Sequence, residues 1–249
     1  MKEQRTTGMI CVTDKLGIEF RMCRIDYIVK DDGHYLYTFR PDYSVIDMLS
    51  PPLFQGIPGL NLDLRKEEYA REDMEPVFIT ERTPGKNRAD LWELLQSVGM
   101  DHLNRLEWLI RTDLQYFGDS MYAIRYEEPT VVDMRDANLT FRVMSLRILK
   151  EICAGNDVIL PNITIDRSNR TFAYHLLMDI LKKNDSKIKE MRSEGKLPSL
   201  GRRRKEINQK DLEFVKLNMD MGIMTSDVAA KKLGIGRATL FRRLKEMER

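Results

Sequence analysis

The sequence predicts a mixed α+β protein: a β-rich amino-terminal region that also holds helices, a long connecting helix, and an all-α module of three helices at the carboxy terminus. Two observations lead to this fold class. Apolar residues alternate with other residues in short runs before residue 40, whereas they recur at helical spacing in 171–194 and in 208–249. We expect the chain to divide into residues 1–130, 131–195, 196–207 and 208–249, of which 196–207 is a linker.

Strands are expected in the first forty residues. Met9 to Val12 is an apolar run, and every second residue from Ile18 to Met22 is apolar. Residues 27–29 and 35–39 flank a polar turn that ends at Gly33, a pattern typical of a β-hairpin. The aromatic residues of these strands are expected to pack in the core of a sheet rather than to bind a ligand.

Between this sheet and the connecting helix, short apolar runs predict an extended segment at 60–64 and strands at 77–80, 121–126 and 158–160. Asn87 is expected to cap a helix from 90 to 98, and a second helix is expected from Asp101. Trp92 and Trp108 would anchor this helical pair.

Positive charge is concentrated at the carboxy terminus. The whole chain carries a formal charge of +2, but residues 196–249 hold 14 Lys or Arg against 7 Asp or Glu, which leaves −5 for residues 1–195. A basic end on a mildly acidic body predicts that residues 196–249 bind double-stranded DNA.

The remaining composition narrows the class of protein. The chain has no apolar run of membrane-spanning length and no cleavable signal pattern, so we expect a cytoplasmic protein without a membrane partner. Its three cysteines, Cys11, Cys23 and Cys153, lack metal-ligand spacing and are expected to be reduced thiols. We expect no cofactor.

Three short helices are predicted after residue 207. Asn208 would cap the first and Gly222 would end it; Thr225 or Ser226 would cap the second, which ends at Gly234. After a tight turn the third helix would begin. The apolar residues expected to face the core of this module are Leu212, Val215, Leu217, Met219, Val228, Ala229, Leu233, Leu240 and Leu244.

The outward face of the third helix is expected to carry Arg237, Thr239, Arg242 and Arg243. Guanidinium groups in this position can pair with guanine edges or with phosphates when a helix lies in the major groove. The basic run 201–205 stands just before the module, where an arm could follow the minor groove. A solvated charged helix is the alternative interpretation.

The arm and the run 234–242 (GIGRATLFR) resemble the carboxy-terminal DNA-binding domain of serine recombinases, the resolvases and invertases. The resemblance implies that the arm enters the minor groove and that residues 238–242 enter the major groove. Ala238 stands where the family commonly has a hydroxyl residue, which puts one base contact in question. The candidate DNA-binding residues are Gly201, Arg202, Arg203, Arg204, Lys205, Thr225, Ser226, Arg237, Ala238, Thr239, Arg242 and Arg243.

Two further segments resemble known families. Residues 157–195 are similar to the end of a serine-recombinase catalytic domain, which implies a homodimer through the helix Thr171–Glu194; a packed surface helix is the alternative. Residues 76–126 are similar to the amino-terminal region of HipA-type toxin kinases, although no kinase catalytic motif follows. Phe172, Leu176, Ile180 and Leu181 would face the core or a partner.

The residues favour a regulator or accessory factor that binds a specific DNA sequence. The first strand lacks the serine and arginine of a recombinase centre, and Asp133, Arg135 and Arg142 are at most a degenerate form of its later Asp-Arg element. The protein is therefore not expected to be an enzyme. The alternatives are an active or degenerate serine recombinase and a regulator associated with a HipA-like toxin–antitoxin system.

Overall fold

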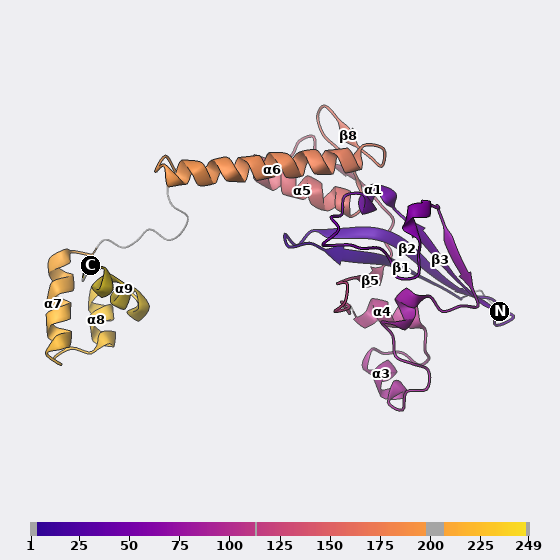
Figure 1. The fold of residues 1–249 in the computed structure, drawn as a ribbon, viewed down its shortest axis with the longest axis horizontal. Helices are drawn as coiled ribbons and strands as arrows, with labels where there is room; N and C mark the ends of the chain where they lie inside the picture. The colour runs from indigo at the N-terminus through magenta and orange to yellow at the C-terminus, as the bar shows by residue number, and fades with distance from the viewer. Residues whose placement is uncertain (1–3, 113, 198–206, 248–249) are drawn as a thin grey trace. The chain divides into compact units, whose positions relative to one another are not determined.

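The structure is a computed structural model that describes residues 4–112, 114–197 and 207–247. The chain divides into two compact units, Met1–Lys187 and Ile188–Arg249. The first unit begins with an antiparallel sheet and continues into helices, and the second contains a cluster of three helices (Figure 1). The protein is therefore mixed α+β, as predicted.

Five antiparallel strands form the main sheet in the order β4-β3-β2-β1-β5. Their bounds are β1 (Gln4–Thr13), β2 (Glu19–Val29), β3 (Tyr35–Pro41), β4 (Tyr69–Glu72) and β5 (Tyr122–Arg125). The runs 18–22 and 27–29 belong to the single strand β2. Its pairing with β1 shifts between Ile10 and Cys11, so Met22 is an extra residue. Because of this bulge, the alternation of apolar residues shifts by one position within β2. The sequence therefore shows two short alternating runs where the structure has one strand.

The rest of the first unit is mostly helical. It comprises α1 (Tyr43–Ile46), a 3₁₀ helix η1 (Leu62–Leu64), α2 (Val77–Thr80), α3 (Leu91–Ser97), α4 (Arg105–Thr112), β6 (Val131–Asp133), α5 (Phe141–Cys153), β7 (Asp157–Ile159), β8 (Thr164–Ile165) and residues 170–187 of α6 (Arg170–Ser193). Helix α5 and the start of α6 lie on one side of the main sheet and α4 on the other, with α3 farther from the sheet, beyond α4 (Figure 1). Strands, α4, α5 and α6 share one hydrophobic cluster that includes Phe20, Leu106 and Leu149.

The buried guanidinium of Arg170 fastens the start of α6. Arg170 is 2% exposed. It pairs with Asp42 (Nη1–Oδ2 3.2 Å) before α1 and with Asp157 (Nη2–Oδ1 3.0 Å) on β7. Its Nη2 also donates to the carbonyl of Gly155. Two carboxylates compensate the buried charge, and the long helix is joined to both sheets.

Two predicted extended segments are wrong. Within 60–64, the Asn61 side chain accepts a hydrogen bond from the Asp63 amide and starts η1. Residues 77–80 form one helical turn, α2, directly after Pro76. A short apolar run does not distinguish a strand from a buried helical turn, because both place adjacent apolar residues in a core.

The helix predicted from 90 to 98 is found as α3, but its predicted cap and the predicted start of α4 are wrong. Asp90 precedes α3, without a side-chain cap, and Asn87 takes no part. Asn104 accepts a hydrogen bond from the Glu107 amide at the start of α4, which is three residues after Asp101. Trp92 is 55% exposed and anchors nothing in the core.

The second unit contains α7 (Gln209–Asp220), α8 (Ser226–Leu233) and α9 (Arg237–Met247). Its buried residues include Leu212, Val215 and Ala229, as predicted, and Ala230, which was not expected. Leu217 and Val228 are exposed, contrary to the prediction. On α7, positions 212, 215 and 219 share one face, and Leu217 lies on the other side of the helix.

All three cysteines are free and buried, and burial raises the pKa of each thiol. The described residues contain no group of three side chains that could hold a metal ion. Among the described helices, none combines the length and the apolar character needed to cross a membrane.

Candidate nucleic-acid interface

Helix α8 is capped at both ends, and a short connection joins it to α9. The Thr225 hydroxyl accepts a hydrogen bond from the Val228 amide (3.5 Å) and caps α8. Gly234 ends α8 in the left-handed conformation, with φ 63° and ψ 38°. Ile235 then packs against the core of the unit, and α9 begins at Arg237. The chain therefore turns between two helices within three residues.

One face of α9 packs inward and the other is exposed. Leu240 is fully buried, and Leu244 and Met247 pack beside it. The exposed side chains on the other face are Ala238, Phe241, Arg242 and Lys245. Arg242 makes no ion pair or hydrogen bond with any residue that the structure describes. Its guanidinium is therefore available to an external acceptor.

The other two arginines of α9 have acidic neighbours. Arg237 pairs with Asp227 (Nε–Oδ1 3.3 Å), which joins the first turns of α8 and α9. Arg243 pairs with Glu246 one turn later (Nη1–Oε2 3.2 Å). The Arg237–Asp227 pair is exposed and contributes little to stability, so a phosphate could displace this carboxylate at small cost. The Arg243 side chain is only 24% exposed, so it is not on the open outward face where it was predicted.

Of the remaining predicted site residues, some lie on α8 and α9 and the others lie outside the described residues. Thr225 and Ser226 lie at the amino-terminal end of α8, next to the Arg237–Asp227 pair. Thr239 is half-buried at the side of α9. The basic run 201–205 lies outside the described residues. The structure thus brings the candidates on α8 and α9 to one end of the unit and places Arg242 on the exposed face.

Two basic residues of α8 and α9 were not among the predicted site residues. Lys245 shares the exposed face of α9 with Arg242. Lys232 on α8 has its ammonium over the ring of Phe214, 4.3 Å from the ring centre. The signal for Lys245 was its position three residues after Arg242, which places both side chains on one helical face.

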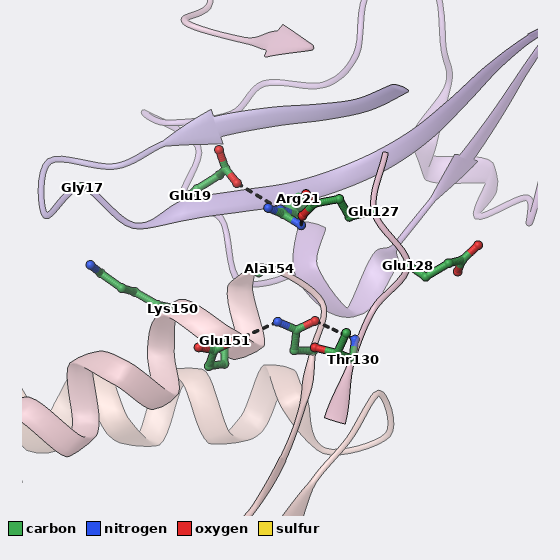
Figure 2. A pocket seen from close by; sticks show the side chains of 10 residues that line it. Gly17, Glu19, Arg21, Glu127, Glu128, Thr130, Lys150, Glu151 and Ala154 are labelled. Atoms are coloured by element: carbon green, nitrogen blue, oxygen red, sulfur yellow. Dashed lines mark hydrogen bonds and ion pairs between the residues drawn. The ribbon is translucent and has the colours of Figure 1, made fainter. Parts of the chain in front are cut away.

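A pocket of the first unit offers a different kind of site. It has a volume of about 340 Å³ and is lined from β2, the segment after β5 and the end of α5 (Figure 2). Arg21 is paired with Glu19 (3.0 Å) and Glu127 (3.2 Å). Four glutamates and two basic residues line the pocket, so its net charge is negative. A pocket of this charge does not favour a phosphate group.

The residues of the Asp-Arg pattern noted in the sequence are engaged in local ion pairs. Arg135 binds Asp133 (Nη2–Oδ2 2.6 Å), and these hydrogen bonds lower the pKa of Asp133 to about 2. Arg142 on α5 pairs with Asp185 on α6. Each guanidinium therefore has its own carboxylate partner, and the two are held by different elements.

Known proteins give no further guide. No protein family, curated protein or solved structure matches this chain.

Proposed function

We propose that this chain is a DNA-binding protein that recognises a specific base sequence through the helices α8 and α9, which act as a helix-turn-helix. In this proposal α9 enters the major groove and α8 lies across its edge. The observation that carries it is the outward face of α9, where Arg242, which has no ion-pair partner within the described part of the chain, lies between Ala238 and Lys245. Leu240 anchors the opposite face of α9 in the core.

The charge distribution supports the same proposal. Residues 196–249 carry +7, and the run 201–205 contributes four of these charges. A basic segment beside a helix of this kind is suited to the narrow minor groove, where the potential is most negative. We therefore propose that residues 201–205 contact DNA independently of its sequence, while Arg242 contributes to base recognition.

We also propose that the protein acts as a homodimer through α6. One three-helix unit contacts few base pairs, so two units on paired half-sites would bind more tightly. The apolar side chains of Phe172, Leu176 and Ile180 recur every four residues on α6 and are 71%, 48% and 38% exposed. Leu181 faces the core instead. A second copy would cover this exposed stripe.

The DNA-binding proposal is tested by selecting bound fragments from genomic DNA and measuring affinity by fluorescence anisotropy. We expect Arg242→Ala to weaken binding to the selected site by about 1–3 kcal/mol and to relax base preference at one position. Lys66→Ala removes an exposed positive charge from the first unit and serves as the control. Equal affinity of wild type and Arg242→Ala for selected and unrelated duplexes would contradict base recognition by α9.

The recombinase alternative predicts covalent chemistry. Purified protein incubated with supercoiled plasmid would then nick one or both strands or leave a protein–DNA adduct. A regulator or accessory factor would shift the mobility of a DNA fragment without breaking it. Strand cleavage that persists in the wild type after repeated purification would favour the recombinase.

A further inference from the structure

An exposed phenylalanine stands on the loop between α4 and β5. Phe117 is 103% exposed, the highest value among the large apolar residues of the described chain. Full exposure of a phenyl ring is costly, since burying a side chain of this size contributes about 1.5–3 kcal/mol. A ring held in this position on an ordered loop is suited to insertion into a partner.

The loop that carries Phe117 is held by a buried arginine. The Arg82 side chain is fully buried, binds the Asp119 carboxylate and lies under the Tyr116 ring at 4.5 Å. The Ser120 amide donates to the Tyr116 carbonyl (2.8 Å), which closes the turn around Phe117. The ring is therefore presented by a fixed turn, and little conformational entropy is lost when it binds.

The same unit contains an apolar groove of about 470 Å³ beside the first half of α6. Buried Met48 and Tyr174 form its floor, and Leu16, Leu53 and Met178 form its walls. This volume is large enough for an aromatic side chain. The groove is open along one side and lies entirely within the first unit.

The groove continues toward the loop of Phe117. A neighbouring hollow of about 410 Å³ shares Asp14, Lys15 and Leu53 with it and reaches Gly118 and Ser120. Phe117 itself lines neither hollow, but Gly118, the next residue in the chain, lines the hollow that adjoins the groove. Around a two-fold axis, each ring could enter the groove of the other copy.

We propose that a second copy of this chain docks on this surface, with Phe117 of each copy seated in the groove of the other. The inference rests on the dimer proposed above, which it deepens, but not on DNA binding. His175 and Asp179 line the groove on α6, and Phe172 and Leu176 lie on the adjacent face of the same helix. One interface can therefore cover both the groove and the exposed stripe.

The rim of the groove fits a second copy better than a nucleic acid. Asp14 and Asp179 carry negative charge there, and Lys15 and Lys182 carry positive charge. A rim of balanced sign can pair with its own symmetry copy, because each charge can meet an opposite one. A nucleic acid would require a surplus of positive charge.

Sedimentation analysis of the full chain tests the proposal. Each variant changes an exposed residue, so that folding is preserved. We expect Phe117→Ser and Leu16→Glu each to raise the dimer Kd at least about tenfold, as for a central interface residue. Met74→Ser, at a residue that is 60% exposed and lines neither hollow, should leave the Kd unchanged. Leu176→Glu tests the α6 stripe separately.

Cross-linking gives a second readout. With oxidised glutathione added as the oxidant, chains with Phe117→Cys mixed with chains with Leu16→Cys should form a disulfide-linked pair, and the three native cysteines should not compete because they are buried. The docking surface is wrong if the wild type is monomeric at about 100 µM. It is also wrong if Phe117→Ser dimerises like the wild type while Leu176→Glu does not, a result that would retain the α6 dimer. A dimer sensitive to Phe117→Ser in a chain without DNA affinity would support this surface and contradict the proposed function.

Discussion

At the scale of single residues, the most informative group is the carboxylate of Asp26 on β2. Its side chain is fully buried, yet three arginines on three strands reach it: Arg5, Arg24 and Arg40. The Thr7 hydroxyl donates a further hydrogen bond (2.7 Å). Burial alone would raise the pKa of Asp26, but the hydrogen bonds from Thr7, Arg5 and Arg24 lower it. The buried charge is therefore well compensated.

We expect Asp26→Asn to destabilise the first unit by about 2 kcal/mol, because a neutral amide no longer balances the positive charge of the three arginines. Glu68→Gln is the control, because Glu68 is an exposed partner of Arg40, and should cost less than about 0.5 kcal/mol. Urea unfolding followed by tryptophan fluorescence measures both, as Trp92 and Trp108 are the only tryptophans of the chain. Equal midpoints for the two variants would show that Asp26 contributes no more than a surface charge.

The pH dependence of this effect has a definite sign. The pKa of Asp26 is lower in the folded state than its unfolded value of about 3.9. The charged carboxylate therefore stabilises the fold above the unfolded pKa, and this stabilisation is lost as the pH falls through the folded pKa. The difference in stability between wild type and Asp26→Asn should therefore shrink below about pH 4. A difference that grows on acidification would have the wrong sign.

At the scale of elements, two glycines in one connection have different roles. Gly234 has φ 63° and closes α8, whereas Gly236 does not adopt positive φ, and a Cβ added there would contact nothing within 4 Å. Gly234→Ala should therefore destabilise the second unit by about 1 kcal/mol. Gly236→Ala should be neutral. Hydrogen exchange of the α9 amides measures both, and equal protection in the two variants would contradict the requirement for left-handed backbone at Gly234.

Helix α7 shows a second property that belongs to this scale. Its inner face packs through Leu212 and Val215, while Phe214, Leu217 and Met221 are each about half exposed on the outer face. Apolar residues therefore occupy both sides of the helix. Periodicity identifies such a helix, but it does not tell which of two apolar faces lies in the core.

At the scale of the whole molecule, the division of charge predicts how salt affects DNA binding. Replacing Arg202, Arg203 and Arg204 together by alanine should weaken binding to all sequences alike and lower the salt slope by about 2–3, because fewer counterions are released. Arg242→Ala should instead act mainly on the selected site. Anisotropy titrations at several salt concentrations compare the two variants. An unchanged slope in the triple variant would exclude phosphate contacts by the arm.

Much of the architecture follows from local patterns. The hairpin of β2 and β3, the long helix α6, and the caps Asn208, Thr225 and Gly234 were predictable, because alternation, helical period and backbone preference act over a few residues. Residues 77–80 and the start of α4 were predicted wrongly, because contacts distant in sequence select among conformations that such short runs allow. The arginine face of α9 was also predictable in part, since helical spacing alone places Arg242 away from Leu240.

The sequence alone determined the α+β class, the basic carboxy-terminal end and the candidate base-reading face, since each depends on composition or on spacing within one element. Only the tertiary structure decided that Arg237 and Arg243 are paired, whereas Arg242 has no ion-pair partner among the residues that the structure describes. It also decided that Phe117 is fully exposed and that the next residue, Gly118, lines a hollow. The Arg237–Asp227 pair and the hollow near Phe117 arise where separate elements meet, and no local pattern encodes the distances between those elements.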